Sequence, residues 1–170
     1  MKTLDLIKSR VSCRAYDERK VSLKKALEVA EAGKFAPSAI NRQICNIYVI
    51  HNKKNVEKLR KLSLDISNRD CMYGAKTVIL VAGPREDRFT YQDGSCILEN
   101  MFLAAHSLKL SSCWINQFED LFNTEKGLKI KKSLNIPEEQ LIVGACILGY
   151  AKDESSLKVK ERKEDFIKVL

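Results

Sequence analysis

Two arginines and a serine near the start of the chain have the spacing to bind an anion. Arg10 and Arg14 stand four residues apart, and Ser12 lies midway between them. A guanidinium stays charged at any physiological pH and holds phosphate through paired hydrogen bonds, and a hydroxyl adds one more donor. Solvated surface charge explains most pairs of arginines equally well, so this segment alone leaves both interpretations open.

Two other polar segments have no obvious structural task. Residues 37–43, with the sequence PSAINRQ, form a turn-rich stretch between a helical pattern and a strand-like run. Lys160 and Arg162 place two more cations in a charged tail that begins at Lys152. Binding residues are often found on loops that a rigid scaffold holds in place, so both segments are candidates for ligand contacts.

The chain has no evident acid–base or metal-binding set of its own. Its two histidines, His51 and His106, are expected to be structural, and its carboxylates are scattered over polar faces. The six cysteines include no C-x-x-C pair, so we expect reduced thiols and no metal site. Those that lie in apolar runs and should pack as small hydrophobes are Cys45, Cys96, Cys113 and Cys146. Catalysis would therefore require a bound cofactor.

Length and composition predict a single domain spanning residues 1–170. With 45% hydrophobic residues, a chain of this length can bury one sizeable core. The longest apolar stretch, residues 141–149, is about half as long as a membrane-spanning helix needs to be. Charges are frequent near the N-terminus, unlike in a secretory signal. We therefore expect no membrane anchor, no secretory signal and a cytoplasmic location.

The net charge of +8 is spread over basic clusters at residues 53–61, 126–132 and 158–163. The first two clusters fall on amphipathic helical patterns and are expected to be solvated faces. No aromatic residues are interleaved with them for base stacking, so nucleic acid is not the expected partner. A nucleic-acid-binding domain driven by this charge remains an alternative, and it predicts an affinity that falls steeply with salt.

Hydrophobic periodicity predicts alternating helices and strands. Helices are expected at residues 4–9, 23–33, 56–64, 94–108 and 124–134, and strands at residues 45–51, 77–82, 112–115 and 141–148. The last strand is the most uniformly apolar and should lie in the middle of a sheet. The β-α-β alternation on its own favours a doubly wound parallel sheet, although neither G-x-G-x-x-G nor G-x-x-x-x-G-K is present.

Taken together and in this order, the motifs resemble the nitroreductase family over essentially the whole chain. An R-x-S-x-R segment followed by an aromatic residue occupies residues 10–16, and an A-P-S-x-x-N-x-Q loop occupies residues 36–43. A long helix then leads into a small-residue strand with a C-W pair at residues 111–115. An apolar strand that ends in G-Y follows at residues 143–150, and the basic tail comes last.

The resemblance implies an α+β fold in place of the parallel sheet. This fold has a central mixed, mostly antiparallel sheet flanked by helices, and it forms an interlocked homodimer with FMN at the subunit interface. The implied enzyme uses NADH or NADPH to reduce nitroaromatic, quinone or similar small electron acceptors by a ping-pong hydride transfer through flavin N5. The flavin, rather than a catalytic side chain, carries this chemistry. A flavin-binding store or redox sensor without turnover remains the alternative.

The family's FMN contacts carry over residue by residue. Arg10 and Ser12 resemble phosphate and ribityl contacts, and Lys160 and Arg162 resemble the remainder of the phosphate clamp. Arg14 would lie at the N1 and O2 edge of the flavin, where a fixed cation raises the reduction potential. The contacts expected within one subunit are Arg10, Val11, Ser12, Arg14, Asn68, Asn116, Gln117, Lys160 and Arg162, and those expected from the partner's loop are Pro37, Ser38, Ala39 and Asn41.

The remaining contacts concern the ring system of the flavin. By the resemblance, Asn68 is expected at the pyrimidine side, and the backbone N–H groups of Asn116 and Gln117 at N5 and O4. The sequence departs from the family pattern at Val11, where a basic residue is usual, and at Gln117, where glycine is frequent. Ile44 also replaces the proline that often follows the loop glutamine.

Overall fold

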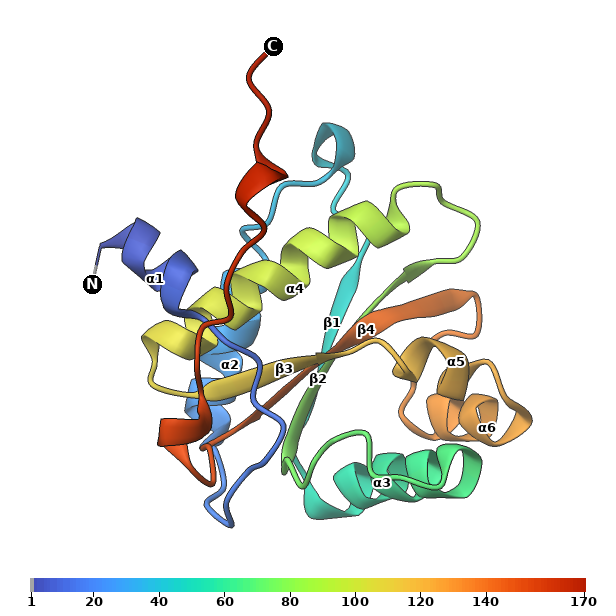
Figure 1. Ribbon diagram of the computed structural model, residues 1–170. Coiled ribbons are helices and arrows are strands. Elements are labelled where there is room, and N and C mark those ends of the chain that lie inside the picture. The colour runs from blue at the N-terminus through green and yellow to red at the C-terminus, as the bar shows by residue number, and fades with distance from the viewer. Residues whose placement is uncertain (1) are drawn as a thin grey trace.

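The computed structural model describes residues 2–170 (Figure 1). Its α-helices are α1 (Thr3–Ser9), α2 (Leu23–Gly33), α3 (Lys53–Ser67), α4 (Thr90–Ser107), α5 (Phe118–Phe122) and α6 (Glu125–Ser133). Its strands are β1 (Asn46–Ile50), β2 (Thr77–Pro84), β3 (Ser111–Ile115) and β4 (Gln140–Gly149), and its 3-10 helices are η1 (Ala39–Asn41), η2 (Glu154–Ser156) and η3 (Glu164–Phe166). Every predicted element is present, and α5 is the helix that periodicity does not predict. No helix within residues 2–170 has the length and apolar character to cross a membrane.

The strands form one antiparallel sheet in the order β1-β2-β4-β3. Strand β4 lies between two others, which confirms the inner position that its apolar sequence predicts. The parallel sheet favoured by the β-α-β alternation is wrong. After α3 the chain returns along residues 68–76, so Ile50 at the end of β1 pairs with Val78 at the start of β2. Because the chain re-enters the sheet at the end it had left, the two strands run in opposite directions.

Helices cover both faces of the sheet (Figure 1). Helices α2 and α4 pack on one face, and α3, α5 and α6 pack on the other. Along β2, Val78 and Leu80 belong to the core on the α3 side, whereas Ile79 and Val81 belong to the core on the α4 side. This burial on both sides explains why β2 and β4 are apolar at nearly every position instead of alternating.

A bulge in β4 reverses which side chains face which core. The register shifts between Val81 and Ala82 of β2, opposite residues 142–144 of β4. Val143 faces the α4 side, and so does Cys146, three residues later. A regular strand would place these two on opposite faces, so one extra residue accommodates the change.

Polar caps set the starts of the helices. The side chain of Ser22 accepts from the N–H of Lys25 at 3.3 Å, as expected from the sequence. Asn52 accepts from the N–H of Asn55 at 2.8 Å, and α3 therefore begins three residues before its predicted start. Helix α4 likewise begins at Thr90 rather than at residue 94. Its first turn is polar, so the apolar period used for the prediction does not reach it.

The basic cluster at residues 126–132 is not entirely a solvated face. Lys131 is only 3% exposed, and its ammonium donates to the carbonyls of Glu138 and Gln140. Burial, followed by the charge of Arg85, lowers the pKa of Lys131. This lysine therefore ties α6 to the start of β4.

All six cysteines are free, and four of them are buried. Cys113 and Cys146 are buried as predicted, whereas Cys45, at the entrance to β1, and Cys96, on α4, are only half-buried. Cys13 and Cys71, which stand outside apolar runs, are buried. Tertiary packing, rather than the local run, decides the burial of these two thiols.

Candidate cofactor site

The segment from Arg10 to Arg14 lies along the edge of the sheet. Ser12 and Ser112 form a parallel bridge, and the N–H of Cys13 donates to the carbonyl of Ser112 at 2.9 Å. Because β3 is an edge strand, the segment takes its unpaired side. Cys13 points inward and is 1% exposed, so the arginines and the serine, which alternate with it, fall on the opposite side.

The two arginines of this segment influence the Cys113 thiol on β3 electrostatically. Burial raises the pKa of the Cys113 thiol, and Arg14, a hydrogen bond with Ser12, and Arg10 act in the opposite direction. The ion pair of Arg10 is a distant one, with 4.0 Å between its Nε and Oε1 of Glu99 on α4. Two guanidinium groups and a hydroxyl therefore gather where carboxylate compensation is weak, and this arrangement suits an anion.

A histidine lies at the Arg10 end of the segment. Oγ of Ser9 is 2.8 Å from Nε2 of His106 on α4. Burial, then the charges of Lys109 and Arg10, lower the pKa of His106. These effects favour the neutral form of the ring, and an anion bound beside it would raise its pKa.

The C-terminal end of β3 continues the row of donors. Asn116 and Gln117 follow the strand directly and lead into α5. Within residues 2–170, neither of their backbone N–H groups donates a hydrogen bond to another residue. Because the Arg10–Arg14 segment and β3 run parallel, Asn116 lies roughly 7 Å beyond Arg14 along the strand direction. The same edge of the sheet thus carries both groups of predicted contacts.

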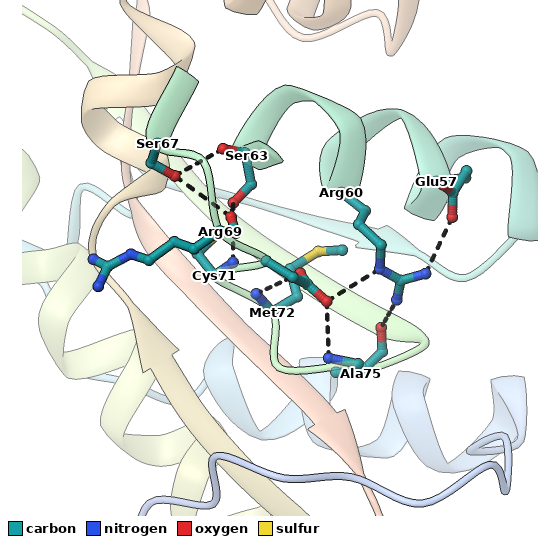
Figure 2. Close-up of polar contacts among 10 residues, drawn as sticks. Glu57, Arg60, Ser63, Ser67, Arg69, Cys71, Met72 and Ala75 are labelled. Atoms are coloured by element: carbon teal, nitrogen blue, oxygen red, sulfur yellow. Dashed lines mark hydrogen bonds and ion pairs between the residues drawn. The ribbon is translucent and has the colours of Figure 1, made fainter. Parts of the chain in front are cut away.

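The loop between α3 and β2 is held by a network of hydrogen bonds, shown in Figure 2. The hydroxyl of Ser63 donates to the carbonyl of Arg69 at 2.6 Å and accepts from the N–H of Cys71 at 2.9 Å. The carboxylate of Asp70 accepts from Nε of Arg60 at 3.2 Å and from two backbone N–H groups of the loop. With its polar groups paired in this way, the loop backbone has one well-defined shape.

This network fixes Asn68 and Arg69 next to the end of β3. Asn68 ends α3 in the left-handed conformation, with φ of 54°, which asparagine tolerates better than most residues. Nη2 of Arg69 donates to Oε1 of Gln117 at 3.5 Å. The loop that carries Asn68, the residue predicted for the pyrimidine side, thus reaches Gln117 through the side chain of Arg69.

The loop at residues 37–43 has an unusual backbone. Ile40, Asn41 and Gln43 all have positive φ, at 46°, 57° and 51°. This conformation is uncommon for residues other than glycine and is most unfavourable for a β-branched side chain such as that of Ile40. Ile40 is 91% exposed, so the loop holds a strained isoleucine toward the outside of the subunit.

Two aspartates hold this loop in place. Oδ1 of Asp93 on α4 accepts from the N–H of Ala39 at 3.1 Å, and Arg42 pairs with Asp87 at 2.8 Å. Asp93 is 5% exposed, and within residues 2–170 its Oδ2 is buried without a hydrogen-bond partner. The same carboxylate lines a cavity of about 320 Å³, together with Pro37 and Ser38.

The two groups of predicted contacts approach α4 from different sides. The Pro37–Gln43 loop meets the helix at Asp93, whereas the Arg10 segment meets it at Glu99 and His106. At 3.6 residues per turn, those two positions lie about 130° around the helix from Asp93. Figure 1 also shows η1 and α1 well apart along α4. One chain therefore does not bring the two groups together.

The two tail cations predicted to bind phosphate make few contacts with the rest of the chain. Lys160 and Arg162 are exposed, and the contact that Arg162 makes is with the carbonyl of Lys160 at 3.3 Å. The tail leaves the fold beside the Arg10 segment, because the N–H of Lys152 donates to the carbonyl of Ala15 at 3.0 Å. It then runs away from the sheet to the C-terminus (Figure 1).

Comparison with known proteins identifies the family. The model of the nitroreductase family matches residues 7–69 and 66–150. The chain belongs to the nitroreductase family. A relative from Archaeoglobus fulgidus, named as a candidate NADH dehydrogenase/NAD(P)H nitroreductase, is 31% identical over 156 residues, which cover 89% of this chain and 86% of that protein.

Solved structures of nitroreductases share this fold. A nitroreductase from Bacteroides fragilis with bound FMN superposes with a TM-score of 0.91 at 29% identity, covering 100% of this chain and 99% of that one. A nitroreductase from Desulfitobacterium hafniense gives a TM-score of 0.89 at 24% identity, covering 100% of this chain and 99% of the other. The α+β fold with a mostly antiparallel sheet is therefore confirmed.

Three residues at the site were not predicted as contacts from the sequence. Asp93 and His106 lie on α4 and meet segments far away in sequence, and only the folded chain reveals those contacts. Arg69 immediately follows Asn68, and its place beside Gln117 depends on the shape of the loop. No sequence signal marks Asp93, because its burial against the loop appears only in the folded chain.

Proposed function

We propose that this member of the nitroreductase family is a cytoplasmic FMN-dependent oxidoreductase that works as a homodimer of single-domain subunits. In this proposal NADH or NADPH reduces the enzyme, and a nitroaromatic compound, a quinone or a similar small acceptor reoxidises it in a ping-pong cycle through flavin N5. When bound, FMN supplies the redox chemistry. The observation that carries the proposal is the row of hydrogen-bond donors along the β3 edge, from Arg10 to Gln117.

The donor set fits the chemical groups of FMN. The phosphate is an anion, and Arg10 and Ser12 offer it a guanidinium and a hydroxyl, with His106 close by. Arg14 comes next along the strand and can hold its positive charge against the N1 and O2 edge, where reduction develops negative charge. Val11 contributes backbone and apolar contact in the same segment.

The far end of the row fits the ring of the flavin. The unpaired N–H groups of Asn116 and Gln117 can donate to O4 and N5, which are hydrogen-bond acceptors in the oxidised cofactor. Asn68 lies in the loop that Arg69 joins to Gln117, and its amide can recognise the pyrimidine side. Fixed donors cost little reorganisation when the charge on the ring changes.

A second subunit would supply the Pro37–Asn41 loop, comprising Pro37, Ser38, Ala39 and Asn41. This part of the proposal is supported by the separation of the two groups of contacts around α4. Large apolar side chains are also exposed on α1, on α2 and in the loop after α2, including Leu4 at 66%, Leu27 at 50% and Phe35 at 76%. Exposed apolar patches of this kind mark protein interfaces. In the dimer, Lys160 and Arg162 of the tail would complete the phosphate clamp.

An absorbance spectrum of freshly purified protein, taken before and after FMN addition and desalting, tests the cofactor. We expect a retained flavin spectrum, and we expect Arg10→Gln to weaken FMN binding much more than riboflavin binding, because only FMN carries the phosphate. A spectrum that FMN does not restore refutes the proposal. If FMN binds tightly but neither NADH nor NADPH is oxidised with any acceptor, the protein is a flavin store or sensor.

A further inference from the structure

The backbone of Arg69 is fixed more firmly than an ordinary surface residue requires. Its carbonyl accepts from Ser63 at 2.6 Å and lies 3.5 Å from the hydroxyl of Ser67. The next residue, Asp70, is locked by Arg60, whose guanidinium also donates to the carbonyl of Ala75 at 3.1 Å. Figure 2 shows the side chain of Arg69 reaching outward from this network, away from every other labelled group.

The guanidinium of Arg69 has no anionic partner within residues 2–170. The side chain is exposed, and the hydrogen bond it makes is a long one, 3.5 Å to the neutral amide of Gln117. By contrast, Arg60 and Arg42 are both paired with carboxylates. Arg69 therefore keeps a full positive charge and most of its donors available for a ligand.

Its position excludes the cofactor phosphate as that ligand. Arg10 and His106 mark the phosphate end of the row, whereas Gln117 marks the opposite end, where the ring is expected. A negative group that reaches Arg69 must therefore belong to a molecule lying over the ring, which in the proposed cycle is either the nicotinamide donor or the electron acceptor.

We propose that Arg69 selects acceptors that carry a carboxylate, by binding that group at the rim of the site. The inference rests on the proposed function and names the substrate class for the same site. The fork of a guanidinium matches the two oxygens of a carboxylate, and the neutral amide of Gln117 holds the fork in place without neutralising it. A lysine at this position would keep the charge but lose the paired geometry.

The test compares two acceptors of similar size on the FMN-loaded enzyme, 4-nitrobenzoate and 4-nitrobenzyl alcohol. We expect the wild type to favour the carboxylate in kcat/KM, and Arg69→Gln to reduce this preference about ten-fold, as loss of one charge-assisted contact would. The preference of Arg69→Lys for the carboxylate should lie between that of the wild type and that of Arg69→Gln. Lys126→Gln, which removes an exposed charge on α6 that pairs with Asp65 of α3, serves as the control for net charge.

A binding measurement complements the kinetics. Benzoate should perturb the flavin absorbance of the wild type with a dissociation constant about ten-fold lower than for Arg69→Gln, while FMN affinity, measured separately by flavin fluorescence, changes less. If FMN affinity falls as much as benzoate affinity, Arg69 is a cofactor contact and the inference is wrong. Equal use of both acceptors by an FMN-loaded enzyme overturns this inference alone. A protein that binds no FMN overturns the proposed function, and this inference with it.

Discussion

Replacing Ser63 with alanine should loosen the loop that carries Asn68 and Arg69. Ser63 is fully buried, and its hydroxyl both donates to the carbonyl of Arg69 and accepts from the N–H of Cys71. Ser63→Ala removes both hydrogen bonds and leaves the buried N–H of Cys71 without an acceptor. A lost hydrogen bond costs about 1 kcal/mol, and an unsatisfied buried group costs about 1–3 kcal/mol. We therefore expect the free energy of unfolding to fall by about 2–3 kcal/mol.

Ser67→Ala is the matched control. Ser67 lies one turn later on α3, and its hydroxyl donates to the carbonyl of Ser63 at 2.7 Å, a group already within the helix. Its contact with the loop is a long one, 3.5 Å to the carbonyl of Arg69. Both substitutions replace a serine of α3 with alanine, and helix propensity changes by only a few tenths of a kcal/mol, so the difference between them reports mainly the buried contacts. We expect Ser67→Ala to change the stability by less than about 0.5 kcal/mol.

Urea unfolding at one protein concentration and one FMN concentration measures the difference, because ligand binding and assembly both shift apparent stability. The midpoint should fall for Ser63→Ala with the slope unchanged. FMN affinity should fall as well, because Asn68 loses its fixed position. Equal effects of the two substitutions would show that the network in Figure 2 does not hold the loop.

Three further predictions concern α4. Asp93→Ala should weaken FMN binding by about 1–3 kcal/mol in a fluorescence titration, because the N–H of Ala39 loses its acceptor; Asp93→Asn retains an acceptor oxygen and should have a smaller effect, and the reverse order would contradict this role. Burial and the charge of Lys109 lower the pKa of His106, so the neutral ring stabilises the fold above pH about 6.5, and this contribution is lost as pH falls through the lowered pKa. Urea unfolding of the protein without FMN should therefore show a loss of stability between pH 7 and pH 5, and His106→Asn should make that loss smaller. Gly94→Ala should cost about 1–3 kcal/mol in urea unfolding, because a Cβ there would lie 2.7 Å from a methyl group of Val143; a neutral effect would mean that β4 yields easily.

Much of the fold can be read from the sequence because its signals are local. Covered on both faces, strands β2 and β4 are continuously apolar, and caps such as Ser22 mark helix starts. Strand direction is not a local signal. The alternation of helices and strands is the same for a parallel and an antiparallel sheet, and the direction depends on where residues 68–76 return the chain.

Some residues of the candidate site can likewise be predicted from local sequence, and others cannot. The row from Arg10 to Arg14 is visible in the sequence because its donors alternate within five residues. Asp93 and Lys131 are not visible, because each is a charged residue whose burial depends on a backbone group brought from elsewhere in the chain. Sequence patterns place such residues at the surface, since an unpaired buried charge is costly.

Helix α4 connects the two halves of the proposed site. Near its start, Asp93 fixes the Pro37–Gln43 loop, and near its end, His106 contacts Ser9 beside the Arg10 segment. The two positions are thirteen residues apart, or about 20 Å along the helix. In a symmetric dimer, each copy of α4 would thus hold the loop for one FMN and the phosphate segment for the other. The absence of a side chain at Gly94 lets the helix lie directly on Val143, so the packing of α4 on β4 sets the spacing of both sites. A substitution that moves this helix should therefore alter FMN affinity even though it touches no cofactor contact.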